Sequence, residues 1–125
     1  MNRRMTFRVL GLAIAAITAL ALVGCAPEPP TEPPGIVGTV TNLVPGDERP
    51  DSILVEGGVQ AAGAVSDKAQ VGIAPSTLFF SADGKPAKGS SIVKGATVRV
   101  WFTGPVAELY PVQGTAQAVQ VMSAP

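Results

Sequence analysis

The sequence has no histidine and only one cysteine, Cys25, so two common sources of protein chemistry are nearly absent from its 125 residues. Without histidine, the chain lacks the usual general base and the commonest metal ligand. A single cysteine cannot form an internal disulfide, so a folded domain must depend on its own hydrophobic core. These absences favour a protein that is not an enzyme and that uses no metal ion and no cofactor.

Positive charge is scarce once the first segment of the chain is set aside. The formal net charge is zero, but Arg3, Arg4 and Arg8 precede residue 25, whereas all nine acidic residues follow it. The rest of the chain has six basic and nine acidic residues and therefore a net charge of −3. Nucleic-acid-binding domains present a basic surface to the phosphates. We therefore expect no nucleic-acid partner.

The N-terminal segment has a cationic start followed by a predominantly apolar run at residues 9–23. This run is shorter than the roughly 20 residues that a membrane-spanning helix needs, and its pattern is typical of a secretory signal peptide. We therefore predict that residues 1–24 are a signal peptide that is cleaved on export. The alternative is a signal anchor that remains uncleaved.

The end of the apolar run, Leu22-Val23-Gly24-Cys25, resembles the bacterial lipobox, in which aliphatic and small residues precede an acylated cysteine. The resemblance implies that Cys25 carries a diacylglyceryl group, with acyl chains such as palmitate. An ordinary buried thiol is the alternative. One acyl chain holds a protein to a membrane only marginally, whereas two or more hold it stably. We thus expect an exported protein anchored in the bacterial cell membrane, with the choice between inner and outer membrane left open.

Residues 25–34 follow as the lipidated cysteine and a proline-rich tether. Proline-rich segments adopt an extended polyproline II conformation and act as semi-rigid spacers. We expect this tether to pack poorly and to hold the domain some tens of ångströms above the bilayer. A ligand for a proline-recognition domain is the alternative interpretation.

Residues 35–125 show the alternation and the β-branched residues of a small all-β domain. We predict strands at residues 36–44, 52–56, 67–73, 96–103 and 116–122, with residues 76–80 as a short edge extension. A helical turn is expected at residues 90–94, and a tight turn at Asp83-Gly84. Five strands with a helical turn before the fourth favour a small OB-like barrel, and an open β-sandwich is the alternative.

Two local patterns suggest chemistry but lack the context that such chemistry needs. Asp47, Glu48 and Asp51 could ligate calcium, but their spacing does not match an EF-hand loop, so we interpret them as a solvated loop. Ser91-Ile92-Val93-Lys94 matches the S-x-x-K motif of penicillin-binding enzymes, but the companion S-D-N and K-T-G motifs are absent. Neither pattern is interpreted as a site.

The segment at residues 98–113 reads VRVWFTGPVAELYPVQ. It resembles the YobA-like family of small bacterial lipoproteins, in which a strand ending in F-T-G-P is followed by E-S-Y-P-x-Q. The chain departs from this pattern at Leu109, where the family tends to have serine. The resemblance extends less specifically over most of residues 35–122. It implies an OB-like barrel, a location in the cell envelope and no established activity, and it provides no catalytic residues.

Four residues of this segment form the candidate binding face. The alternation places Arg99 and Trp101 on the side of their strand opposite the aliphatic residues, and Glu108 and Tyr110 follow in the next loop. Tryptophan beside arginine can form a stacking and cation–π surface for a sugar, a peptide or a small cation. The alternative is that the loop carrying Tyr110 covers Trp101, while Arg99 pairs with Glu108.

The sequence thus favours a membrane-anchored binding or interaction module without enzymatic activity. Its expected partners are the lipid bilayer, through acylated Cys25, and an envelope protein, peptide or glycan. A structural or accessory subunit of an envelope complex is one alternative. An envelope hydrolase is another, although it would need a nucleophile and a base drawn from serine, lysine, aspartate or glutamate alone.

Overall fold

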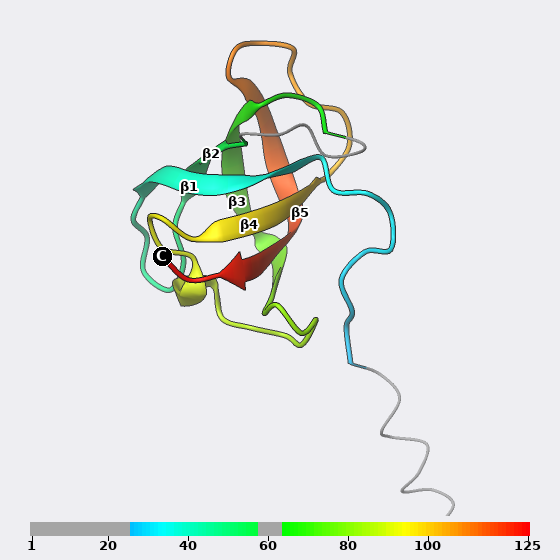
Figure 1. The fold of residues 1–125 in the computed structure, drawn as a ribbon, viewed down its shortest axis with the longest axis vertical. Coiled ribbons are helices and arrows are strands. Elements are labelled where there is room, and N and C mark those ends of the chain that lie inside the picture. Colours follow the sequence, from blue (N-terminus) through cyan, green and yellow to red (C-terminus); the bar gives the residue numbers. More distant parts are fainter. Residues whose placement is uncertain (1–25, 58–63) are drawn as a thin grey trace, which may run out of the picture.

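A computed structural model of the chain describes residues 26–57 and 64–125 (Figure 1). The elements are β1 (Ile36–Val44), β2 (Ser52–Glu56), β3 (Lys68–Phe80), the 3-10 turn η1 (Gly89–Ser91), β4 (Thr97–Phe102) and β5 (Val112–Ser123). The predicted signal peptide and its junction with Cys25 lie outside the described residues. Within those residues, no helix is long and apolar enough to cross a membrane.

The five strands close into a barrel in the order β1-β2-β3-β5-β4. β1 is antiparallel to both β2 and β4, β4 is antiparallel to β5, and β3 runs parallel to β5. Closure leaves no strand edge exposed for pairing with another chain. This strand order, with η1 between β3 and β4, is that of an OB-type barrel. The predicted all-β, five-stranded OB-like fold is therefore confirmed, and the alternative of an open sandwich is wrong.

Aliphatic residues from all five strands fill the interior of the barrel. The largest fully buried side chains of this interior are those of Ile36, Ile53, Val40, Val55, Val71, Val98, Val100 and Val119. Period-2 alternation places Ile53 and Val55 of β2, and Val98 and Val100 of β4, on the inner face, and all four are buried. Phe102 departs from the pattern and is only partly buried, since the β4–β5 register shifts between Trp101 and Phe102.

β3 is one long strand and not the two segments that the sequence suggests. Its register with β5 is irregular around Pro75, where the backbone lacks an N–H group. The buried Thr77 hydroxyl compensates: it accepts a hydrogen bond from the Ala74 N–H at 2.9 Å and donates one to the Ala116 carbonyl at 2.7 Å. The prediction that residues 76–80 form an edge is therefore wrong, because they pair with β5.

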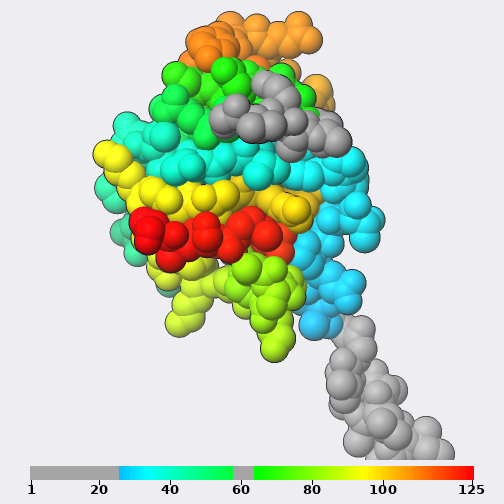
Figure 2. All heavy atoms as spheres, in the orientation of Figure 1, coloured from blue at the N-terminus to red at the C-terminus, as the bar shows by residue number. Residues whose placement is uncertain are grey.

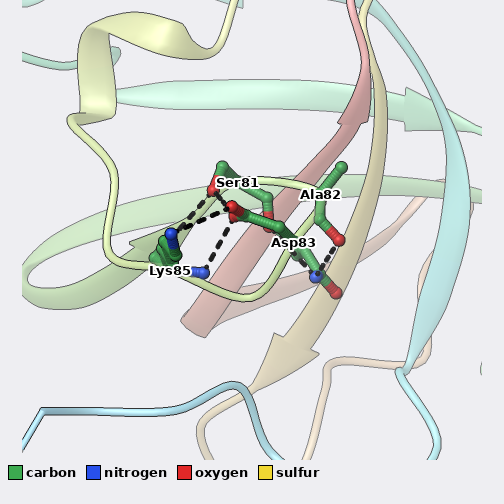
Figure 3. A network of polar contacts seen from close by, with 5 residues as sticks. Ser81, Ala82, Asp83 and Lys85 are labelled. Carbon is green, nitrogen blue, oxygen red and sulfur yellow. Dashed lines mark hydrogen bonds and ion pairs between the residues drawn. The ribbon is translucent and has the colours of Figure 1, made fainter.

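The turn after β3 has the Asp-Gly geometry that the sequence predicts (Figure 3). Gly84 adopts a φ of +84°, and its N–H donates to the Ser81 carbonyl at 2.9 Å. The Ser81 hydroxyl donates to the Asp83 carboxylate, which also accepts the backbone N–H of Lys85 at 3.2 Å. Behind the turn, the buried amide of Gln120 donates to the Ser81 carbonyl at 3.1 Å. The base of the turn is thereby fixed to β5.

Candidate functional site

Trp101 lies on the outer side of β4, as predicted, but its ring is not available to a ligand. The side chain is only 5% exposed and clusters with Phe80 and Ala118 outside the barrel interior. The indole Nε1–H donates a hydrogen bond to the Glu32 carbonyl at 2.8 Å. The predicted stacking surface of Trp101 with Arg99 is therefore not formed.

The proline-rich tether provides the cover over Trp101. Glu32 and Pro33 line a small hollow of about 240 Å³ together with Trp101, and the Gly35 N–H donates to the Val100 carbonyl at 2.8 Å. Figure 2 shows this segment lying along the side of the barrel. Extended proline-rich backbone has carbonyls without internal partners, and the indole uses one of them. The second half of the tether is therefore docked, contrary to the predicted spacer that packs poorly.

Arg99 and Glu108 are both exposed, and they do not pair. In the described part of the chain the ion pairs are Lys68–Glu56 and Lys85–Asp83. The alternative hypothesis, in which the loop carrying Tyr110 covers Trp101 and Arg99 pairs with Glu108, is therefore right that Trp101 is covered. It is wrong about the segment that covers Trp101 and about the partner of Arg99.

Tyr110 lies beside the start of β3, where it contacts Asp67 and Lys68 and not Trp101. Its side chain is 69% exposed, and its hydroxyl donates to the Asp67 carboxylate at 3.5 Å. The Lys68 Nζ lies 5.8 Å from the centre of its ring, and the same ammonium group pairs with Glu56 at 3.0 Å. The structure thus places Tyr110 at the corner where β2, β3 and the start of β5 meet.

Hydrogen bonding shifts the pKa of both members of this ion pair. The Thr41 hydroxyl and the Lys68 ammonium hold the pKa of Glu56 below its usual value of 4.5. The Glu56 carboxylate in turn raises the pKa of Lys68 above its usual value of 10.5. Both groups are therefore charged near neutral pH, and they frame Tyr110 without adding net charge.

A shallow polar groove of about 370 Å³ lies on the outer face of β2, β3 and β5. The residues that line the polar groove are Ser52, Gln70, Gly72, Gln113, Gly114 and Thr115. Strand pairing sets Gly72 between Ser52 and Thr115, and Gln70 beside Gln113. A Cβ built on Gly72 would lie 3.7 Å from both the Gly114 carbonyl oxygen and the Thr115 Oγ1. The missing side chain therefore leaves the floor of the groove open.

The predicted strand at residues 116–122 begins four residues later than β5, which begins at Val112, so the sequence pattern did not indicate the polar groove. The polar side chains of Gln113 and Thr115 alternate with buried Val112 and Ala116, which is the period-2 pattern of a half-buried strand. Gly114 interrupts that pattern and lies before the predicted strand at residues 116–122. Alternation along residues 67–73 places Gln70 on the outer face, but it does not indicate which residues lie beside Gln70 across the sheet.

A second cleft of about 510 Å³ lies at another part of the surface, between the β1–β2 loop and η1. Asp47, Glu48, Arg49 and Lys88 line it, so acidic and basic groups are mixed. Within residues 26–57 and 64–125, no cluster of three or more His, Cys, Asp or Glu has a geometry that could hold a metal ion. The Ser91 hydroxyl donates to the Lys88 carbonyl at 2.7 Å. We therefore do not interpret this cleft as a catalytic or metal-binding site.

The fold and the polar groove define the class: a small OB-type barrel with an outer polar face and a docked N-terminal tether. Comparisons of the chain with protein-family models, with curated proteins and with solved structures each find no match.

Proposed function

We propose that this protein is a lipid-anchored bacterial envelope protein, similar to the YobA-like family, whose barrel binds an uncharged glycan without catalysing a reaction. The observation that carries this proposal is the polar groove on β2, β3 and β5. The exposed ring of Tyr110 lies near Lys68, which precedes Gln70 of the groove by two residues on β3. The anchor is inferred from the lipobox-like segment that ends at Cys25.

The chemistry of the groove matches a ligand rich in hydroxyl groups. The amides of Gln70 and Gln113 each offer donors and an acceptor, and the hydroxyls of Ser52 and Thr115 offer both functions. No residue that lines the groove is charged, so an uncharged ligand does not strand a buried charge there. The ring of Tyr110 supplies an apolar face with a polar tip, which suits the faces of a sugar ring. An acidic polymer is disfavoured by the net charge of −3 beyond residue 25.

Binding is tested with the mature, lipid-anchored protein in nanodiscs, probed with a panel of uncharged cello- and chito-oligosaccharides. We expect Gln113→Ala and Tyr110→Ala to weaken binding at least tenfold, because each variant removes a contact from the groove or its corner. The matched control is Arg99→Ala, which alters an exposed polar side chain on β4 and should bind normally.

Two results would contradict the proposed site. Wild-type protein that binds no member of the panel would refute the glycan ligand. Arg99→Ala protein that loses affinity as strongly as Gln113→Ala would move the site to the outer face of β4. Circular dichroism of each variant separates a lost contact from a lost fold.

The anchor is tested independently by metabolic labelling with a fatty acid. Wild-type protein should incorporate the label and the Cys25→Ser variant should not. Wild-type protein without label would refute the lipoprotein assignment, while leaving the test of the groove unaffected.

A further inference from the structure

We propose that the docked tether holds the barrel directly at the bilayer surface, with the β3–β4 loop (residues 81–88) facing the lipid headgroups. The inference rests on the proposed lipid anchor at Cys25. It adds an interaction surface, a phospholipid headgroup layer, to a part of the barrel that lies apart from the polar groove.

The docked tether runs toward the β3–β4 loop as it approaches its N-terminal end. At one point it is held by the hydrogen bond from Trp101 to the Glu32 carbonyl. Nearer to Cys25, Pro29 lies against the loop: a Cβ built on Gly84 would be 3.6 Å from the Pro29 Cγ. Figure 2 shows the tether and the protruding loop in contact. The chain therefore leaves the barrel beside this loop.

Docking shortens the reach of the tether. Ten extended residues would span about 30 Å at about 3.1 Å per residue. With Pro29 docked, three residues lie between the barrel contact and Cys25, and the four Cα–Cα steps from Cys25 to Pro29 span at most about 14 Å. A barrel held so closely must touch the headgroup region, and the surface nearest to the anchor is the one that does so.

The β3–β4 loop is built to keep its shape at such a surface. Its base is fixed by the Gln120 amide, which donates to the carbonyls of Ser81 at 3.1 Å and Ala82 at 3.4 Å. Its tip is closed by the contacts of Asp83 with the Ser81 hydroxyl and the Lys85 N–H (Figure 3). The loop therefore presents a defined surface.

Three lysines bring positive charge to this end of the barrel. Lys85, Lys88 and Lys94 follow Gly84 in the sequence, while Asp47 and Glu48 lie beside Lys88 in the neighbouring cleft. Asp83 lies 3.9 Å from the Lys85 Nζ and offsets part of one of these charges. Lysines near a membrane surface are attracted to the phosphates of anionic lipids, and salt weakens this attraction.

The arrangement leaves the corner of the polar groove accessible. The β4–β5 loop, which carries Tyr110, lies at the end of the barrel opposite the β3–β4 loop (Figure 1). With the β3–β4 loop on the headgroups, the β4–β5 loop lies on the side of the barrel away from the membrane. A glycan in the envelope could then reach it without displacing lipid.

The orientation is tested with the mature, acylated protein in nanodiscs that contain an anionic lipid and a headgroup-attached quencher. Because acylation occupies Cys25, the only cysteine in the sequence, each introduced cysteine is the only thiol to label. One fluorophore is placed with Ala82→Cys in the β3–β4 loop and another with Leu109→Cys in the β4–β5 loop, both at exposed positions. We expect quenching at position 82 to be at least threefold stronger than at position 109.

Undocking the tether should remove the difference. In a Trp101→Phe protein whose Pro29 and Pro33 are replaced by serine, the threefold ratio should fall toward one. Equal quenching at both positions in protein with the wild-type tether would overturn the inference alone. Mass spectrometry that finds no acyl chain on Cys25 would instead overturn the proposed anchor, and this orientation with it.

The contribution of the lysines has its own matched control. In the Ala82→Cys protein, Lys85→Gln with Lys88→Gln should reduce quenching, and the reduction should disappear at high salt. Lys68→Gln makes the same chemical change at the opposite end of the barrel and should leave quenching unaltered. Equal effects of the two changes would overturn the contact of the β3–β4 loop with headgroup phosphates.

Discussion

Replacement of Trp101 by alanine should destabilise the barrel, because the indole ring is buried beneath the tether and is not displayed to a ligand. Its exposed fraction is 5%, and a buried large aromatic side chain removes about 150–250 Å² from water. At about 25 cal/mol per Å², this burial corresponds to about 4–6 kcal/mol. Measured losses for such replacements in cores are about 3–5 kcal/mol. A domain of this size is stable by about 5–15 kcal/mol, so we expect Trp101→Ala to remove a large share.

The matched variant Trp101→Phe separates packing from hydrogen bonding. Phenylalanine retains most of the ring against Phe80 and Ala118 but loses the donor to the Glu32 carbonyl. That carbonyl belongs to an exposed residue and can turn to water, so the loss should be about 1 kcal/mol. Urea denaturation followed by far-ultraviolet circular dichroism measures both variants. Because the chain has a single tryptophan, the wild-type emission should be blue-shifted and protected from acrylamide until the protein unfolds.

Two results together would refute this reasoning. If Trp101→Ala were no less stable than Trp101→Phe, the ring would make no buried contact. If the native emission were also quenched as readily as that of the unfolded chain, the indole would face solvent. The predicted binding face of Arg99 and Trp101 would then regain its support.

Three further outcomes are expected from the fold. Thr77→Val should lower the free energy of unfolding by about 2–4 kcal/mol, since the part-buried Ala74 N–H and the buried Ala116 carbonyl lose their partner. Thr77→Ser keeps both bonds, so equal urea midpoints for the two variants would contradict the account of β3. Gly95→Ala should cost about 1–2 kcal/mol because Gly95 has a φ of +93°, and a thermal midpoint like that of wild type would argue against it. Because the pKa of Glu56 is lowered, its contribution to stability is complete above pH 4.5 and is lost as the pH falls through the folded-state pKa. Lys68→Gln should therefore reduce the loss of stability at acidic pH. If the free energy of unfolding of this variant depended on pH as that of wild type does, the ion pair would be excluded as the source of the loss.

The barrel was predictable because the information it needs is local. In β2 and β4, apolar residues alternate with polar ones, and Ile53, Val55, Val98 and Val100 are all buried. Period-2 alternation assigns each residue to one side of a strand. A helical turn before the fourth strand then selects the OB-type order from the few closed arrangements of five strands. Because of Pro75, the sequence predicts two separate segments at residues 67–73 and 76–80. The structure has one continuous strand, since the Thr77 hydroxyl bonds to Ala116 of the distant strand β5.

The surroundings of the outer faces were not predictable in the same way. Alternation places Trp101 outside the barrel interior, but it does not indicate what covers a residue on that side. The cover is a segment 69 residues earlier in the chain. Tyr110 illustrates the same limit, since its neighbours Asp67 and Lys68 become adjacent only when β5 joins β3. Local pattern fixes the side of a strand, whereas long-range packing fixes what that side meets.

This division of the outer surface has a functional consequence. The tether occupies the outer face of β4 at Trp101, while the polar groove lies across β2, β3 and β5. Residues that share no partner and lie apart usually contribute independently to the free energy. Trp101→Phe should therefore leave glycan affinity unchanged, and Gln113→Ala should leave headgroup quenching unchanged. A variant that altered both measurements without unfolding the barrel would show that the tether and the groove are coupled, and anchoring would then have to be treated as part of ligand recognition.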